Sequence, residues 1–128
     1  QLFLGEVKHE ESIFDHSWIE LDGEIIDVAI LLSMQNDMIY PPILLGKSIS
    51  TLHIPTANYQ YQTGRGLDAE ADTISRTNIA TYINMYPNSK NGLWELILQI
   101  SETVNLHLDI TAMQQKYSNI YWQIKMGD

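Results

Sequence analysis

Residues 14–27 of the chain read Phe14-Asp15-His16-Ser17-Trp18-Ile19-Glu20-Leu21-Asp22-Gly23-Glu24-Ile25-Ile26-Asp27. Two strand-like runs flank the dipeptide Asp22-Gly23 in this segment. An Asp-Gly pair in that position is a strong signal for a β-hairpin, because a type I′ turn needs positive φ at both central residues. We therefore expect residues 13–32 to form two antiparallel strands joined by this turn.

The turn fixes which residues face each other across the hairpin. With Asp22 and Gly23 as the loop, Trp18 lies opposite Asp27, and His16 lies opposite Ala29. Side chains alternate between the two faces of a sheet, so His16, Trp18 and Asp27 share one face. The other face is the expected core stripe, and it carries Ile19, Leu21, Ile26, Val28 and Ile30.

Further strands are expected on both sides of the hairpin. Alternating residues predict strands at Leu2–Val7, Ile13–Leu21 and Glu24–Leu32. Shorter strands are predicted at Ile43–Leu45, Thr51–Ile54 and Asn58–Gln62, the last with Tyr59 and Tyr61 on one face. Residues 1–66 are therefore expected to be mainly strands and loops.

From Leu67 onward the apolar residues recur at helical spacing. We predict helices over residues 67–86, 93–106 and 109–121, the last capped by Asp109 or Thr111. Strands followed by helices indicate an α+β fold, with an antiparallel sheet packed against the helices of residues 67–128. The 128 residues are expected to form a single domain.

Composition excludes several classes of function. Sixteen acidic and seven basic residues give a net charge of −9, which argues against binding to nucleic acid or to an anionic membrane. No apolar run approaches the ~18 residues of a membrane span, and no signal peptide is visible, so a cytoplasmic location is expected. Cysteine is absent, which excludes disulfides, thiolate metal sites and a cysteine nucleophile within these residues.

His16 and Asp27 are the candidate catalytic pair. They are diagonal neighbours on one face of the predicted hairpin, and inclined side chains of such neighbours can reach a hydrogen bond. Asp27 would then orient the His16 imidazole and fix its tautomer, as a base in a nucleophile–base–orienter triad requires. Trp18 is expected to support the pair by covering it and excluding water.

The segment from Phe14 to Asp27 resembles the His and Asp strands of the transglutaminase-like cysteine peptidase superfamily. In that family a His-x-Trp-hydrophobic-Glu strand leads through a turn to a strand that carries the triad Asp. The closest likeness is to small bacterial members, among them the leader peptidases of lasso-peptide pathways. The resemblance covers about a quarter of the chain, and implies that His16 is the general base, Asp27 its orienting partner, and a peptide or protein the substrate.

Two features depart from the family pattern. The family's nucleophile is a Cys at the start of a helix upstream of these strands, whereas this chain has no Cys and starts at the first strand. The hairpin is also tighter than in transglutaminases proper. We expect a fragment from which the nucleophile-bearing segment is missing. The alternatives are a nucleophile on another chain, as in a homo-oligomer, and a catalytically inactive relative that serves as a protein-binding domain.

The remaining polar and aromatic residues indicate no second site. His9, His53 and His107 lack the spacing of metal ligands, so we expect no metal and no cofactor. No serine lies in a Gly-x-Ser-x-Gly elbow. Asp15 and Glu20 are expected to be solvated. The tyrosines are expected to serve packing rather than base stacking, and they are Tyr59, Tyr61, Tyr82, Tyr86, Tyr117 and Tyr121.

Overall fold

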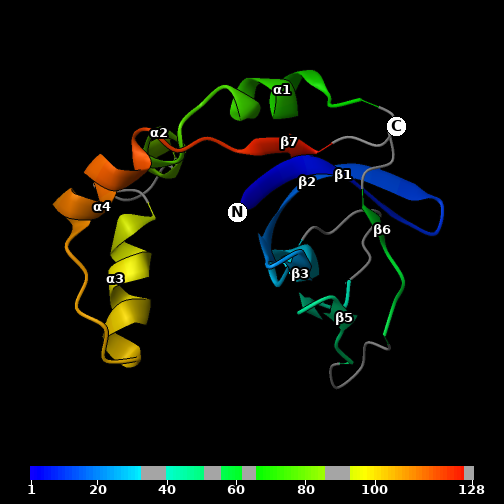
Figure 1. The fold of residues 1–128 in the computed structure, drawn as a ribbon, viewed down its shortest axis with the longest axis horizontal. Helices are drawn as coiled ribbons and strands as arrows, with labels where there is room; N and C mark the ends of the chain where they lie inside the picture. Colours follow the sequence, from blue (N-terminus) through cyan, green and yellow to red (C-terminus); the bar gives the residue numbers. More distant parts are fainter. Residues whose placement is uncertain (33–39, 51–55, 62–65, 86–92, 126–128) are drawn as a thin grey trace. The chain divides into compact units, whose positions relative to one another are not determined.

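The computed structural model describes residues 1–32, 40–50, 56–61, 66–85 and 93–125, and it has an α+β architecture (Figure 1). Strands dominate the N-terminal part and helices follow. The predicted α+β class is confirmed. The residues group into two compact units, Gln1–Asp72 with Gln123–Asp128 and Thr73–Trp122, and each is described by itself.

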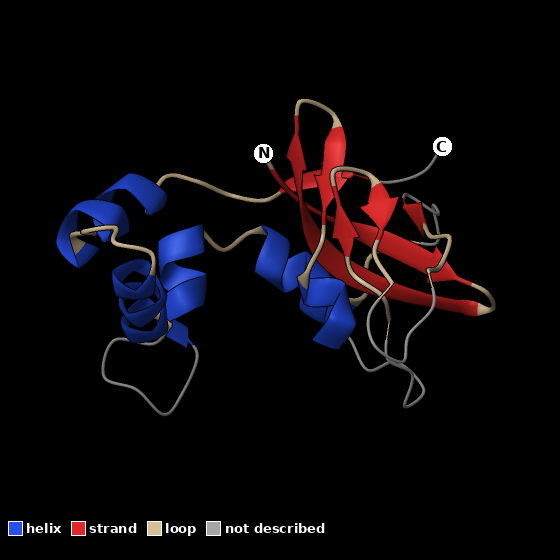
Figure 2. Ribbon diagram, turned by 90° about the horizontal axis from the view of Figure 1, so that it is seen from below, coloured by secondary structure: helices blue, strands red, loops and turns tan. Residues whose placement is uncertain are grey.

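The first unit is built on a mixed, mostly antiparallel sheet, whose strands are drawn in red in Figure 2. The strand order is β3-β2-β1-β6, and β7 also pairs with β1. The strands of the sheet are β1 (Leu2–His9), β2 (Ser12–Leu21), β3 (Glu24–Ile26), β6 (Gln60–Tyr61) and β7 (Gln123–Lys125). β2 pairs with the whole length of β1 on one side. On its other side β1 pairs antiparallel with β6 near Val7 and parallel with β7 near Gly5. β1 is therefore the central strand.

The predicted β-hairpin turn is present. Asp22 and Gly23 have φ angles of 52° and 84°, as a type I′ turn requires. Leu21 pairs with Glu24, and the predicted register holds as far as Ile26. A similar turn with positive φ at Leu45 and Gly46 joins two short strands. These strands are β4 (Ile43–Leu44) and β5 (Lys47–Ser48).

The strand predicted over Glu24–Leu32 ends at Ile26, so the prediction is wrong beyond that residue. Asp27 instead exchanges backbone hydrogen bonds with Ile43 of β4, at 2.9 and 3.0 Å. The Asp27 carboxylate also accepts the Ile30 N–H, which caps the 3₁₀ helix η1 (Ala29–Leu32). The expected pairs Trp18–Asp27 and His16–Ala29 are therefore absent from the ladder, because the Asp27 side chain turns the chain out of the sheet.

The core lies on the face of the sheet opposite to the predicted stripe. Ile19, Leu21 and Val28 are 48%, 53% and 59% exposed, so they do not form the core. Ile30 is fully buried, but on η1 rather than on a strand. The core cluster lies on the face that carries His16, and it contains Phe3, Val7, Phe14, Trp18, Ile30 and Tyr40. Aromatic rings on this face outweigh the aliphatic stripe because each buries a larger apolar area.

The helices are α1 (Ala69–Ser75), α2 (Ile79–Met85), α3 (Trp94–Thr103) and α4 (Ile110–Tyr117). The single helix expected over residues 67–86 is thus divided. Asn78 divides it, because its side chain accepts the Thr81 N–H and starts a new helix. Asp109 caps α4 by accepting the Ala112 N–H, as predicted. No helix in the described ranges is long and apolar enough to span a membrane.

The short strands were predicted only in part from the spacing of apolar residues. β4 and β6 fall within the strands predicted at Ile43–Leu45 and Asn58–Gln62. The strand predicted at Thr51–Ile54 lies outside the described residues. β7 was not predicted, because three residues after a helix are too few to show an alternating pattern.

Candidate functional site

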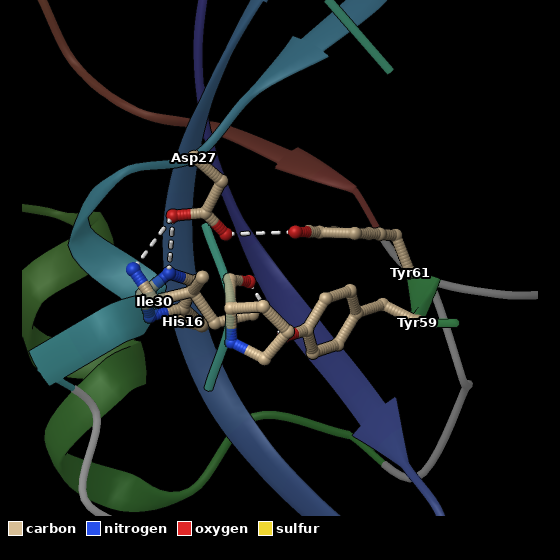
Figure 3. Close-up of polar contacts among 6 residues, drawn as sticks. His16, Asp27, Ile30, Tyr59 and Tyr61 are labelled. Atoms are coloured by element: carbon tan, nitrogen blue, oxygen red, sulfur yellow. Dashed lines mark hydrogen bonds and ion pairs between the residues drawn. The ribbon is translucent and has the colours of Figure 1, made fainter. Parts of the chain in front are cut away.

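The centre of the candidate site is a hydrogen bond of 2.9 Å between His16 Nε2 and Asp27 Oδ1 (Figure 3). β2 carries His16 on the core face of the sheet, and Asp27 follows the last residue of β3. The His16 side chain is 11% exposed and that of Asp27 is fully buried. The structure therefore brings together the two residues that the sequence singled out.

Three donors converge on the Asp27 carboxylate. His16 and the Ile30 N–H contact Oδ1, at 2.9 and 3.0 Å, and the Tyr61 hydroxyl donates to Oδ2 at 2.8 Å. A buried carboxylate is costly unless such donors compensate its charge. Each donor also restricts rotation of the carboxylate, so the atom that faces His16 has a fixed position.

This arrangement assigns the His16 tautomer. An ionised carboxylate can only accept hydrogen bonds, so His16 Nε2 carries the hydrogen in the contact with Asp27. In the neutral ring the lone pair then belongs to Nδ1, which is the atom able to accept a proton. The geometry meets the requirement for an oriented base, namely one nitrogen held by a carboxylate and the other basic.

Trp18 lies next to the pair rather than opposite Asp27 in a strand ladder. Its indole is almost completely buried and contacts the Tyr61 ring, with 4.9 Å between the ring centroids. The indole also extends over Gly5, the residue paired with His16 on β1. A Cβ at Gly5 would lie 2.8 Å from Trp18 Cη2 and would collide with the Lys125 carbonyl oxygen. Gly5 thus makes room for the indole beside His16.

Glu20 links the site to β7. Its carboxylate accepts hydrogen bonds from the Trp18 indole N–H at 2.9 Å and from Lys125 Nζ at 2.7 and 2.9 Å. Burial by itself raises the pKa of Glu20, but the hydrogen bonds from Lys125 and Trp18 and the Lys125 charge outweigh it, so the pKa is lowered. The expectation that Glu20 is simply solvated is therefore wrong.

Asp15 is the other carboxylate expected to be solvated. It accepts the Asp68 backbone N–H at 2.9 Å, just before α1, so it too has a structural contact.

Tyr59 and Tyr61 lie beside each other on the core face and differ in their acceptors. The Tyr59 hydroxyl donates to the Pro41 carbonyl oxygen at 2.7 Å, whereas that of Tyr61 donates to Asp27. Burial and then the Asp27 charge raise the pKa of both phenols, and for Tyr61 the hydrogen bond to Asp27 raises it further. Both hydroxyls therefore remain protonated donors at neutral pH.

Sequence reasoning identified His16 and Asp27 but missed the other groups around the carboxylate. Tyr61 was expected to lie on the same strand face as Tyr59, and this spacing was the one signal that both approach the core. Nothing in the sequence indicated the contact between the Ile30 N–H and Asp27, because this contact forms only when the segment predicted as a strand adopts the 3₁₀ helix η1. No group of three or more His, Asp or Glu residues in the described ranges is arranged to hold a metal ion. Of the other histidines, His53 lies outside the described residues.

Comparison of the chain with protein-family models, curated proteins and solved structures finds no match. The resemblance to the transglutaminase-like superfamily therefore rests on residues 14–27 alone and remains a prediction.

Proposed function

We propose that the first unit supplies the general base and its orienting carboxylate to a transglutaminase-like cysteine hydrolase that acts on amide or peptide bonds. The observation that supports this most is the 2.9 Å hydrogen bond between His16 Nε2 and the fully buried, triply hydrogen-bonded Asp27. The nucleophilic thiol would come from outside these 128 residues, because they contain no Cys. By themselves they are expected to be inactive.

The proposed reaction assigns one step to each group. His16 Nδ1 takes the thiol proton, the thiolate attacks the carbonyl carbon, and an S–C bond forms as the C–N bond breaks. His16 returns the proton to the departing amine. His16 then deprotonates a water molecule, which attacks the thioester carbon. The C–S bond breaks, the carboxylic acid leaves, and His16 returns its proton to the thiolate, which restores the thiol. Asp27 stabilises the imidazolium in each of these proton transfers without itself accepting the proton.

The proposal is tested on the native gene product that contains this chain. Its cysteines are alkylated with iodoacetamide near neutral pH, and the modified positions are found by peptide mapping. We expect one cysteine upstream of Gln1 to react faster than an ordinary thiol, and to slow at least about tenfold in His16→Gln, because imidazole assists thiolate formation. The hydrolase proposal would be refuted if the gene product had no upstream Cys. It would also be refuted if the alkylation rate of the upstream Cys were the same in the wild type and in His16→Gln.

The second candidate is a protein-binding domain without catalytic activity. It is favoured by the exposed apolar side chains of Ile19, Leu21 and Val28, which lie on or just beyond the β2–β3 hairpin. Ile19 and Leu21 lie on the same face of β2, and exposed large apolar side chains on one face are typical of a protein-interaction surface. The alkylation experiment separates the two candidates, since a binding domain requires no reactive cysteine near His16.

A further inference from the structure

We propose that the first unit contains a second ligand site, for a small aromatic carboxylate, and that its occupancy is communicated to His16 through Tyr61 and Asp27. The site is a cavity of about 500 Å³ between the β4–β5 hairpin, the segment 56–59 and β6. That volume lies in the usual range for small-molecule sites. Neither His16 nor Asp27 lines it.

The walls of the cavity are apolar and aromatic. Ile25 and Ile43 line it together with Tyr59 and Tyr61. The hydroxyls of both tyrosines are already occupied as donors, by the Pro41 carbonyl and by Asp27. The tyrosines therefore offer a ligand their ring surfaces, which favour an aromatic group in stacked or edge-to-face contact.

All the polar side chains among the described lining residues can donate hydrogen bonds, and all of them except Lys47 can also accept. Lys47, Ser48, Thr56 and Asn58 all line the cavity, each of these side chains can donate, and no Asp or Glu is among the described lining residues. The Ser48 hydroxyl accepts the Ala57 N–H, which leaves its own hydrogen to donate to a ligand. Within the described ranges, the Lys47 ammonium forms no ion pair.

None of the ten described residues that line the cavity carries a carboxylate, in a chain with sixteen acidic and seven basic residues. Among these described residues, hydrogen-bond donors and the Lys47 ammonium lie beside aromatic walls, and this combination matches a ligand that carries both a carboxylate and a ring. Two carboxylates lie next to lining residues, that of Glu24 beside Gly46 and that of Asp27 behind the Tyr61 hydroxyl, where three donors already hold it. Glu24 is therefore expected to weaken the binding of an anion.

Tyr61 connects this cavity to the candidate catalytic pair. Its ring lines the cavity, while its hydroxyl lies 2.8 Å from Asp27 Oδ2. Asp27 lies between Tyr61 and His16, as Figure 3 shows. A ligand that packs against the Tyr61 ring changes the position of its hydroxyl, and the Asp27 carboxylate transmits that change to the imidazole. The coupling is independent of whether His16 serves a cysteine nucleophile.

The test is a titration with N-acetylphenylalanine, followed by NMR signals of the cavity residues and of the His16 ring. We expect saturable binding that weakens about three- to tenfold in Lys47→Met, or when the carboxylate of the probe is replaced by an amide. Glu24→Gln should tighten binding. Lys116→Met on α4 is the matched control and should leave binding unchanged.

The coupling has its own readout. Saturation of the cavity should shift the His16 ring signals in the wild type, and that shift should fall at least about twofold in Tyr61→Phe because the hydroxyl contact to Asp27 is lost. Non-saturable binding, or equal affinity in Lys47→Met and Lys116→Met, would overturn the proposed site. Saturable binding that leaves the His16 signals in place would overturn the coupling.

Discussion

Asp27 serves two purposes, one in folding and one in the candidate site. Its backbone hydrogen bonds to Ile43 and its side-chain bond to the Ile30 N–H end β3 and begin η1. The same carboxylate holds His16 and receives the Tyr61 hydroxyl. Because one carboxylate has all these partners, the turn out of the sheet and the orientation of the imidazole are formed together.

Tyr61→Phe tests the contribution of the phenol to this carboxylate. The substitution keeps the ring contact with Trp18 and removes one donor to a buried charge, so we expect a loss of about 1.5–3 kcal/mol in the free energy of unfolding. The control is Tyr59→Phe, which removes a donor to the neutral Pro41 carbonyl and should cost about 0.5–1.5 kcal/mol. Chemical denaturation measures both values. A larger loss for Tyr59→Phe would contradict the role given to Asp27.

Gly5→Ala tests the close approach of the Trp18 indole and β7. A Cβ at Gly5 meets the Lys125 carbonyl as well as the indole, so we expect a loss of at least about 2 kcal/mol. Gly23→Ala is the matched control. It adds a Cβ where nothing lies within 4 Å but where φ is +84°, and it should cost about 1 kcal/mol from backbone strain. If Gly5→Ala were the milder change by thermal denaturation, the packing described for the site would be wrong.

At the scale of elements, β7 is the addition that makes the sheet mixed. It pairs in parallel with β1, and Lys125 contacts both the Glu20 carboxylate and the Phe3 ring, the latter at 4.8 Å from the ring centroid. An ion pair reinforced by a cation–π contact and partly shielded from water is stronger than an isolated surface pair.

Lys125→Met should therefore destabilise the first unit by about 1–3 kcal/mol at neutral pH, because it leaves the Glu20 carboxylate with fewer donors. Chemical denaturation of the variant gives this value. Lys116→Met, which removes an ammonium near the Tyr117 ring on α4, is the control and should change stability by less than about 1 kcal/mol. Equal effects of the two substitutions would show that the Lys125–Glu20 contact contributes little.

The elements also show what local sequence can and cannot predict. The turn at Asp22-Gly23 and the Asp109 cap depend on neighbouring residues, and both were predicted. β7 pairs with a strand about 120 residues away, which no local pattern encodes. The division into α1 and α2 depends on competition between continuing the helix and capping it with Asn78, and helical spacing alone does not decide that competition.

In the candidate site, too, the features set by neighbouring residues were predicted, and those set by distant segments were not. The proximity of His16 and Asp27 was predicted from the hairpin, although the contact forms where the chain leaves the sheet rather than across a continued ladder. The prediction of the core face was wrong because it relied on the hydrophobicity of Ile19, Leu21 and Val28 alone, and these side chains are exposed. The aromatic residues that cover the opposite face, Tyr40, Tyr59 and Tyr61, come from segments whose position was not predictable.

At the scale of the whole molecule, the pH dependence of stability follows from the buried acids and phenols. The pKa of Glu20 is lowered from its ordinary value of 4.5, so the stability from its contacts is present above that value and is lost as the pH falls through the lowered pKa. The pKa values of Tyr59 and Tyr61 are raised above 10.0, so their contribution is present below pH 10 and is lost as the pH rises beyond it.

Denaturation curves recorded across the pH range should therefore show a decline at each end. Lys125→Met should reduce the acidic decline, and Tyr61→Phe should reduce the alkaline one. The share of the tyrosinate absorbance that belongs to Tyr59 and Tyr61, measured as the difference between the wild type and the two Tyr→Phe variants, should rise together with unfolding rather than before it, because ionisation of these buried phenols is unfavourable in the folded state. Full ionisation of all tyrosines in the folded protein would contradict the burial and hydrogen bonding of Tyr61.

The most direct test of the central claim, that Asp27 orients His16 as a base, is a long-range ¹H–¹⁵N NMR spectrum of the imidazole at a pH where it is neutral. We predict the tautomer with hydrogen on Nε2 and the lone pair on Nδ1 in the wild type. In Asp27→Asn this preference should weaken or reverse, because an amide can donate as well as accept. A wild-type ring with hydrogen on Nδ1, or one whose tautomer is unchanged in Asp27→Asn, would contradict the account.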